Sequence, residues 1–320
     1  MNGFVVGLQF GDEGKGRVSA WALKDYEWNV RFNGGPNAGH TVYKDGKKYA
    51  LHHLPAGAVF GKKVALHAGM VIDPKKFLKE CNQLNWEFPL FISEDVHLIQ
   101  PEHVALDSDG SGLGSTKRGI AYVYGDRALR KGKRVKDDKE FINAIKGHGN
   151  YVCVYRGMPP MEPGEKALLE GAQGIMLDVD YGHYPFVTSS SVLPSIAHKV
   201  DRTIGVMKAY VSRVGDGPPN HPDVEELRIA GQEFGTTTGR PRKCTWLDLD
   251  DMNYALSIVQ PDEIVVTKLD VLKGMNINVY KNNEMFTIGS LDNYKNFLIE
   301  TFPQIKYFSE SPDGDLIKVR

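Results

Sequence analysis

A short apolar run, Phe4–Leu8, is followed at once by the glycine-rich and charged stretch FGDEGKGR, which ends at Arg17. The apolar run predicts a short buried strand. The residues from Arg17 to Lys24 predict a helix, because apolar side chains recur there at helical spacing. A strand, a glycine-rich turn and a helix in this order aim backbone N–H groups at an anion. We therefore expect a phosphate-binding loop after the first strand.

The rest of the chain alternates between helical and strand patterns. Helices are predicted at Pro74–Leu84, Asp137–Lys146, Asp248–Val259 and from a Ser290 cap to Thr301, with short strands at Ala167–Leu169 and Ile264–Thr267. The sequence contains no repeat and no linker rich in Pro, Gly and Ser. This mixture indicates the α/β class, and we expect one domain spanning residues 1–320.

Composition and charge exclude several classes of protein. The 320 residues are 41% hydrophobic and 25% charged, as in globular proteins. A net charge of −1 gives no global attraction to nucleic acid or anionic membranes. The three isolated cysteines support neither a disulfide framework nor a structural zinc site. Without a long apolar run or a signal-like segment, we expect a cytoplasmic protein that has no membrane or nucleic-acid partner.

The charged loop suggests chemistry as well as binding. Gly11, Gly14 and Gly16 permit a tight turn and close approach of phosphate oxygens, and Lys15 adds a positive charge. The loop is not a Walker A sequence, because Gly16 follows Lys15 where Ser or Thr is required. Asp12 and the neighbouring glutamate would repel a polyphosphate unless they bind Mg²⁺ or abstract a proton. A solvated surface turn is the alternative.

Two further segments carry candidate functional side chains at the ends of predicted elements. NGGPNAGHTV (33–42) is a second glycine-rich loop with Asn37, His40 and Thr41, although a lone histidine is more often structural. EGAQG (170–174) follows a predicted strand and places Gln173 where α/β proteins bind ligands. Segment 108–119 is also rich in glycine, and its bases and hydroxyls suit an ordered anion-binding loop.

Two segments in the second half of the chain suggest recognition of charged and purine groups. GTTTGRPRKCTWLD (235–248) can hold a carboxylate or phosphate through threonine hydroxyls and arginines, and a solvated basic turn is the alternative. IVVTKLD (264–270) ends a strand with Lys268 and Asp270. The aspartate can accept from guanine N1–H and the exocyclic amine while the lysine stem covers the base. An ordinary strand-end salt bridge is the alternative.

Six motifs together resemble one family. QFGDEGKG, NAGHT, EGAQG, YPFVTSS, GTTTGRPR and TKLD occur in this order between Gln9 and Asp270, and the chain resembles the adenylosuccinate synthetase family. The resemblance implies an α/β domain on a large central, mostly parallel sheet flanked by helices, active as a homodimer in purine biosynthesis. It also implies a ligase that converts GTP, IMP and L-aspartate with Mg²⁺ to adenylosuccinate, GDP and phosphate through a 6-phosphoryl intermediate.

The resemblance assigns roles to individual residues. Asp12 is the expected general base for purine N1–H and, with the Gly39 carbonyl, a metal ligand. His40 is the expected acid at the transferring phosphoryl group, Lys15 neutralises the phosphates, and Gln173 lies near the purine. The implied GTP contacts are Gly11, Asp12, Glu13, Gly14, Lys15, Gly16, Arg17, Gly39, His40, Thr41, Arg242, Lys268, Leu269, Asp270, Ser309 and Ser311.

The same resemblance implies two further substrate sites. The purine monophosphate contacts are Asp12, Lys15, Asn37, Ala38, Gly39, His40, Thr116, Arg130, Gln173, Thr188, Val214 and Arg240, where Arg130 crosses from the partner subunit. The aspartate contacts are Thr236, Thr237, Thr238, Gly239, Arg240 and Arg242.

The chain also departs from the family pattern. It is shorter than usual members. Usual members also have other residues at four places, where this chain has RGIAYVY (118–124), RVGDGPPNHPD (213–223), Arg17 and Pro36. These changes favour either a compact enzyme acting on IMP or the phage 2-aminoadenylosuccinate synthase branch, which acts on dGMP with ATP or GTP in a host cytoplasm. Retention of Asp12 favours IMP. A non-catalytic guanine-nucleotide regulator or a generic GTPase would leave Asp12, His40 or GTTTGRPR without a purpose.

Overall fold

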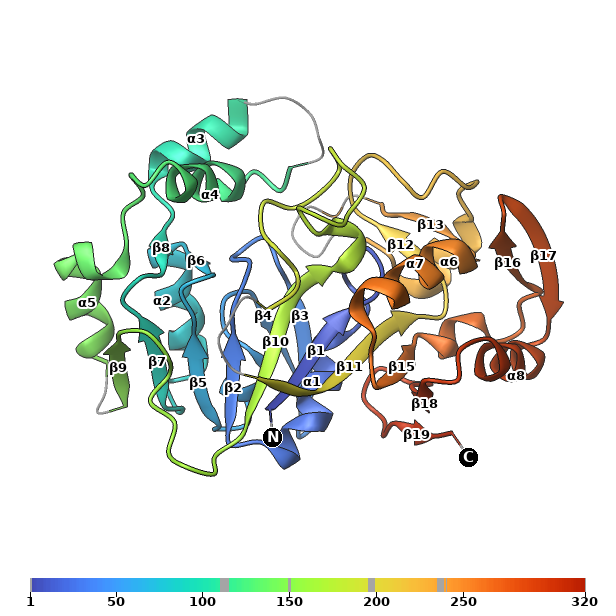
Figure 1. The fold of residues 1–320 in the computed structure, drawn as a ribbon, viewed down its shortest axis with the longest axis horizontal. Helices are drawn as coiled ribbons and strands as arrows, with labels where there is room; N and C mark the ends of the chain where they lie inside the picture. Colours follow the sequence, from blue (N-terminus) through green and yellow to red (C-terminus); the bar gives the residue numbers. More distant parts are fainter. Residues whose placement is uncertain are drawn as a thin grey trace.

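The computed structural model describes residues 2–109, 115–148, 151–194, 199–234, 239 and 241–319. Its centre is a ten-stranded sheet with the order β19-β18-β15-β11-β1-β10-β2-β5-β7-β9 (Figure 1). Every pair in it is parallel except β18–β19, which confirms the expected fold class. Its strands are β1 (Asn2–Gly7), β2 (Trp28–Arg31), β5 (Lys63–Leu66), β7 (Leu90–Ser93), β9 (Val152–Tyr155), β10 (Ala167–Gly174), β11 (Val200–Lys208), β15 (Glu263–Thr267), β18 (Ile305–Phe308) and β19 (Ile317–Lys318).

Four small sheets are attached to this one. They comprise β3 (His40–Lys44) with β4 (Lys47–Leu51), β6 (Val71–Ile72) with β8 (His97–Leu98), β12 (Val211–Arg213) with β13 (Lys243–Thr245), and β14 (Leu247–Asp248) with β16 (Ile277–Lys281) and β17 (Glu284–Gly289).

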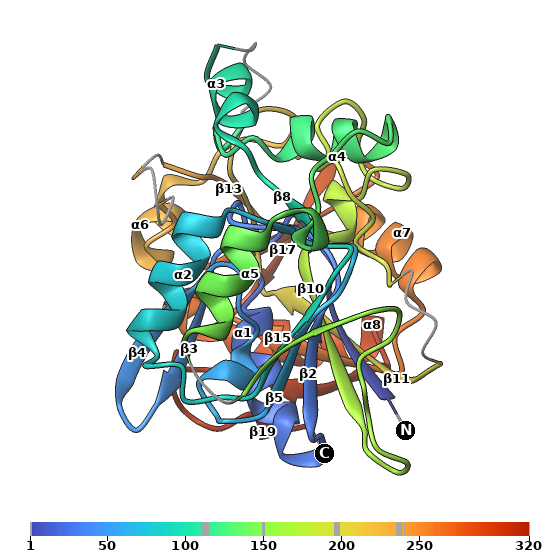
Figure 2. The same cartoon turned by 90° about the vertical axis from the view of Figure 1, so that its left-hand side faces the viewer.

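Helices cover both faces of the large sheet. In Figure 2, α2 and α5 lie on one side and α7 lies on the other. The α-helices are α1 (Lys15–Ala22), α2 (Pro74–Gln83), α3 (Pro101–Asp109), α4 (Ile120–Ala128), α5 (Lys139–Lys146), α6 (Glu225–Gly231), α7 (Leu249–Val259) and α8 (Leu291–Thr301). Single 3₁₀ turns are η1 (Leu23–Asp25), η2 (Ala56–Ala58), η3 (Val135–Asp137), η4 (Ile175–Leu177) and η5 (Leu269–Leu272).

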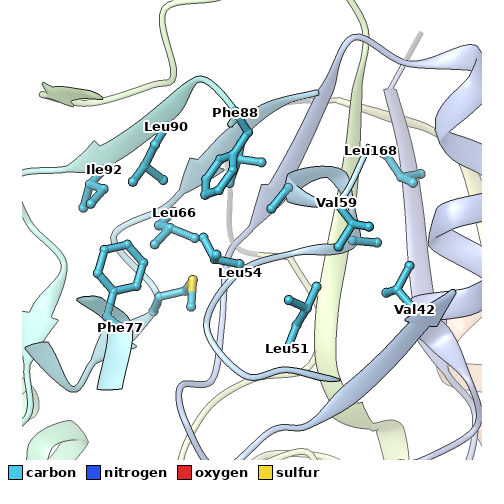
Figure 3. Packing of buried hydrophobic residues seen from close by; sticks show 14 of the residues in the cluster. Val42, Leu51, Leu54, Val59, Leu66, Phe77, Phe88, Leu90, Ile92 and Leu168 are labelled. Carbon is cyan, nitrogen blue, oxygen red and sulfur yellow. The ribbon is translucent and has the colours of Figure 1, made fainter. Parts of the chain in front are cut away.

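The central strands are buried on both faces, and their side chains alternate between two cores. On β1, Val5 belongs to the core under α1, α2 and α5, whereas Phe4 and Val6 belong to the opposite one. On the first side Phe77 of α2 packs with Leu66 and Ile92 of the sheet (Figure 3). Burial on both faces explains why these strands read as continuous apolar runs rather than as alternating patterns.

Helix starts follow the capping residues in the sequence. The Ser290 side chain accepts from Asn293 N at 3.3 Å and begins α8, as predicted. The Asp248 side chain accepts from the amides of residues 250 and 251 at the start of α7. Helix α5 begins at Lys139 rather than at 137, because Asp138 caps it through Phe141 N. Capping oxygens thus fix these starts within two residues.

Two expected loops are partly strands. Strand β10 continues to Gly174, so EGAQG lies within the strand rather than after it. Strand β3 begins at His40, so the second glycine-rich loop ends at Gly39. Helix α1 begins at Lys15, two residues before the predicted start.

All three cysteines are free thiols. Among the described helices, none is both long and apolar enough to cross a membrane.

Candidate active site

The loop between β1 and α1 has the backbone of an anion-binding turn. Gly11, Asp12 and Gly14 all adopt left-handed conformations, with φ of 86°, 60° and 86°. Gly14 is the N-cap of α1, and its carbonyl accepts from the amides of residues 17 and 18. The free amides at the start of α1 therefore face the loop, as the sequence predicts.

Glu13 shapes this loop from beneath. Its buried carboxylate accepts from Gln9 N at 3.2 Å, Gly11 N at 2.8 Å and Lys15 Nζ at 2.6 Å. A Cβ at Gly7 or Gly174 would overlap this carboxylate, so both glycines make room for it. Glu13 thus has a structural task that the sequence did not reveal, and it places the Lys15 ammonium at the loop.

Asp12 points into a different environment. Its side chain is 36% exposed, and its Oδ2 lies 2.7 Å from Arg242 Nη2. Arg242 in turn contacts Glu233 Oε2 through Nη1 at 2.6 Å. The structure therefore joins the predicted base to the arginine of the threonine-rich segment across 230 positions of sequence. It also pairs that base with a cation.

His40 lies beside the phosphate loop. A Cβ on Gly16 would come within 2.9 Å of the imidazole Cδ2, so α1 and β3 can pack this closely because residue 16 is glycine. His40 Nε2 is 3.2 Å from Glu170 Oε1 of β10, but the pair is not aligned as a hydrogen bond. Nε2 is thus a buried nitrogen without a hydrogen-bond partner among the described residues. Such atoms occur where a ligand completes a site.

Burial is the largest cause of the pKa shifts of His40 and of its neighbour Glu170. Burial and the neighbouring Arg31 hold the pKa of His40 well below its usual 6.5. Burial raises the pKa of Glu170, although Arg31 opposes that shift. Arg31 is fully buried and donates through Nη1 to the His52 carbonyl at 3.1 Å, while its Nε and Nη2 have no hydrogen-bond partner among the described residues. We conclude that the imidazole is neutral in this state.

Gln173 connects the two glycine-rich loops. It has a left-handed φ of 59° near the end of β10. Its backbone lies within 3.6 Å of where a Cβ on Gly11 would be, and its side-chain oxygen lies 3.4 Å from the same position on Gly34. That oxygen is buried without a hydrogen-bond partner among the described residues. Gln173 therefore lies next to both loops, and its place near the purine stays a prediction.

The residues expected to read guanine lie beside the amino end of α1, because Thr267 Oγ1 donates to the Glu13 carbonyl at 2.7 Å. Lys268 has a φ of 62°, and its Nζ donates to the Gly231 carbonyl at 3.0 Å. Leu269 N donates to the Ser309 carbonyl, and Ser309 Oγ donates to the carbonyl of Ser311. The Arg17 guanidinium donates to the Gly314 carbonyl; burial lowers its pKa, and the charge of Asp270 opposes that shift. The C-terminal segment, whose match was weak in sequence, thus adjoins the TKLD turn.

The remaining predicted contacts lie farther from this centre or outside the described residues. Thr116, Arg130 and Val214 are exposed. Thr188 N donates to the Leu177 carbonyl, and Asn37 Oδ1 accepts from Gly35 N. Ala38, Gly39 and Thr41 occupy the end of the second loop and the start of β3. Thr236, Thr237, Thr238, Arg240 and part of segment 108–119 lie outside the described residues.

Known proteins resemble this chain over most of its length. The adenylosuccinate synthetase family model matches residues 4–147 and 158–292. The adenylosuccinate synthetase of Picrophilus torridus is 39% identical over 322 residues, covering 85% of this chain and 77% of that one. The enzyme of Helicobacter hepaticus is 38% identical over 331 residues, covering 86% and 80%. The chain belongs to the adenylosuccinate synthetase family. Its curated relatives are GTP-dependent ligases.

Two solved structures share the fold. The fully ligated adenylosuccinate synthetase of Plasmodium falciparum superposes with a TM-score of 0.87 at 27% identity and covers all of both chains. The succinoaminodeoxyadenylate synthetase of cyanophage S-2L, bound to dGMP and to dATP as energy donor, gives 0.79 at 22% identity and covers 99% and 94%. Family membership implies purine nucleotide biosynthesis with GTP and Mg²⁺.

Several residues of the site escaped sequence reasoning. They include the buried charged residues Glu170, within β10, and Arg31 and Lys208, the last residues of β2 and β11. A charge within a strand that is buried on both faces requires a partner, so this pattern was an available signal. Their partners could not be read from the sequence, because each comes from a distant element.

Proposed function

We propose that this chain joins L-aspartate to C6 of IMP at the expense of GTP, releasing adenylosuccinate, GDP and phosphate. The observation that supports the proposal best is the convergence of Asp12, His40 and Gln173 on one phosphate loop. The turn Lys268–Asp270, which we assign to guanine recognition, adjoins the same loop, because Thr267 Oγ1 donates to the Glu13 carbonyl. Neither a GTPase nor a nucleotide-binding regulator would need a base and an acid placed in this way.

Asp12 takes the proton from N1 of the purine, which increases the negative charge on O6. The O6–Pγ bond forms while the bond from Pγ to the bridging oxygen of GTP breaks, and GDP leaves. The aspartate amine then adds at C6, the C6–O6 bond breaks, and phosphate departs with O6. Lys15 and the amides of residues 14–16 stabilise the charge on the transferring group.

His40 serves as a donor to the transferring phosphoryl group. The imidazole is neutral here because burial and Arg31 lower its pKa. Its unpaired Nε2 is available to a phosphoryl oxygen, and the anionic charge of that group favours the protonated ring. The Gln173 side chain would lie near the purine, and its amide oxygen has no hydrogen-bond partner among the described residues.

Magnesium fits the oxygen donors of this site. The Asp12 carboxylate is partly exposed, and Gly39 is exposed immediately before His40. Within the described residues no group of three or more His, Cys, Asp or Glu side chains could hold a metal. Mg²⁺ commonly uses one or two protein oxygens together with substrate phosphates. Asp12 and the Gly39 carbonyl would hold the ion, which supplies charge neutralisation at the phosphates.

The proposed GTP and aspartate sites both adjoin the phosphate loop. GTP would extend from Gly11–Arg17, with Gly39–Thr41 beside it, to the TKLD turn and Ser309 and Ser311. Aspartate would bind at Thr236–Arg242, and Arg242 is the member of that set seen next to Asp12. The purine monophosphate would contact residues 37–40, Gln173, Thr116, Thr188, Val214 and Arg240.

We also propose a cytoplasmic homodimer built from single domains of residues 1–320. Arg130 is exposed, as a residue that reaches a partner's site must be. Arg130→Ala should lose activity, and mixing it with Asp12→Asn should restore about a quarter of wild-type activity. About half of randomly exchanged dimers are mixed, and each has one intact site. No recovery, after exchange is shown with an independent label, would mean that each chain builds its site alone.

Acceptor choice is the decisive test of the proposal. We compare kcat/KM for IMP, GMP and dGMP, each with aspartate and with GTP or ATP. Asp12 at N1 suits a purine without an exocyclic amine at C2, so IMP with GTP should exceed dGMP by at least tenfold, about 1.4 kcal/mol. The cyanophage enzyme, with which this chain shares its fold, represents the alternative. A tenfold preference for dGMP would assign this chain to that activity instead.

A further inference from the structure

Behind Asp12 lies a buried cluster that the proposed chemistry does not use. Glu233 is 1% exposed, and both of its carboxylate oxygens are paired. Oε1 accepts from Lys208 Nζ at 2.8 Å and from Tyr210 OH at 2.6 Å, while Oε2 contacts Arg242 Nη1 at 2.6 Å. Lys208 is also 1% exposed and donates to Ser212 Oγ. We call Glu233, Lys208 and Tyr210 the Glu233 anchor.

The anchor belongs to the same rigid frame as the phosphate loop. Gln9, just before that loop, accepts from Lys208 N at 2.8 Å and donates to the Tyr210 carbonyl at 3.2 Å. Arg242 N donates to the Glu233 carbonyl at 2.9 Å, and an antiparallel bridge joins the next pair, Phe234 and Pro241. Arg242 is therefore held by backbone and side chain at the point where the threonine-rich segment ends.

The charges of the anchor, Arg242 and Asp12 cancel in the observed contacts. Lys208 and Arg242 are cationic, and Glu233 and Asp12 are anionic, so the contacts balance while Asp12 faces Arg242. Burial alone would raise the pKa of Glu233, but the charge of Lys208, the hydrogen bonds from Lys208 and Tyr210, and the charge of Arg242 together lower it to about 2. When Asp12 turns to N1 of the purine, one positive charge is left without a partner. A partly buried cation in that position requires another anion.

We propose that the Glu233 anchor positions Arg242 so that it exchanges Asp12 for an anionic oxygen of a substrate. Glu233 is thus a positioning residue, and Arg242 releases the base only when a carboxylate or phosphate replaces it. The aspartate carboxylate is the expected replacement, and a GTP phosphate is the other source of the same chemistry. This inference rests on the proposed function, because it requires a substrate at Arg242.

Glu233→Gln tests the inference. The amide keeps the size of the carboxylate but places an NH₂ group against Arg242 or Lys208. We expect the KM for aspartate to rise by about tenfold or more, with a smaller change in kcat. A rise confined to the KM for GTP would identify the phosphate as the replacing anion. Values for both substrates within twofold of wild type, in a folded variant, would overturn the inference while leaving the activity of the wild type intact.

Two further variants separate positioning from simple stability. Lys208→Met with Glu233→Gln removes one buried charge of each sign, so it should recover thermal stability but keep the raised KM. A double variant with wild-type KM values would overturn the inference even if the single variant does not fold. Glu165→Gln is the matched control, because Glu165 also pairs with a lysine, Lys63, and an aromatic donor, Trp28 Nε1, at the amino ends of the strands. It should leave both KM values unchanged.

If the wild type forms no adenylosuccinate at all, the proposed function fails, and the KM comparison cannot be made. In that case binding of aspartate alone, measured by calorimetry, still tests the anchor. Wild type should bind aspartate more tightly than Glu233→Gln by about tenfold, and equal affinities would overturn the inference independently of catalysis.

Discussion

The two halves of the candidate centre hold their proposed catalytic residues in opposite ways. At the His40 corner, which comprises His40, Glu170 and Arg31, buried nitrogens lack hydrogen-bond partners among the described residues. At the Asp12 corner, which comprises Asp12, Arg242 and Glu233, both carboxylates contact arginine. In the proposed function, a substrate would add contacts at the His40 corner, whereas at the Asp12 corner it would replace an existing contact. New hydrogen bonds at the His40 corner would therefore favour substrate binding. At the Asp12 corner, breaking the Asp12–Arg242 ion pair would oppose it.

Removing the charge of Asp12 should produce the largest effect. In Asp12→Asn the amide cannot take the N1 proton, so kcat should fall by about 10⁴-fold, the upper end for an acid–base group. The amide can still accept from Arg242, so the fold should persist. Turnover and GTP binding are measured together. A variant with near wild-type kcat would show that the Asp12 corner does not supply the base.

His40→Ala should have the next largest effect. Loss of the donor at the transferring group should lower kcat by about 10²–10³-fold, while substrate KM values change less. Initial rates at varied IMP and GTP separate these quantities. If only the KM values move, the unpaired nitrogen of the His40 corner serves binding, and the contrast between the corners disappears.

Asp270→Asn should act on nucleotide choice rather than on either corner. Its NH₂ would face a guanine donor and leave both groups unpaired, so the KM for GTP should rise by about 10- to 100-fold. The KM for IMP and aspartate should stay near wild type. Parallel measurements with GTP and ATP provide the readout. An unchanged preference for GTP would remove Asp270 from guanine recognition.

The pH dependence of stability offers the smallest and most specific effect. The unfolded chain takes up a proton at His40 near its ordinary pKa of 6.5, but the folded chain resists it because burial lowers that pKa. The contribution of His40 is thus fully present above pH 6.5 and is lost as the pH falls toward the folded value. Through His40, the free energy of unfolding changes by at most about 1.4 kcal/mol per pH unit. Denaturant unfolding of His40→Gln should show a shallower loss between pH 7 and 5, and an identical loss would contradict the assignment.

Sequence alone was sufficient where local signals decide structure. The α8 start at Ser290, the glycine-rich turn between β1 and α1 and the strand before Lys268 were predicted because caps, glycines and apolar runs act within a few residues. Strand β10 was predicted too short because its polar residues looked like a loop, although Glu170 is buried within the sheet. The contacts of Glu233 could not be predicted, since Lys208 and Tyr210 lie more than 20 positions away.

Transfer of an oxygen isotope tests the central claim most directly. IMP labelled with ¹⁸O at position 6 is converted with GTP, Mg²⁺ and aspartate, and the released phosphate is examined by mass spectrometry. If Asp12 activates O6 to attack the γ-phosphorus of GTP, each phosphate released during turnover should contain the purine oxygen. Unlabelled phosphate accompanying adenylosuccinate formation, or phosphate released at the same rate without IMP, would contradict the account.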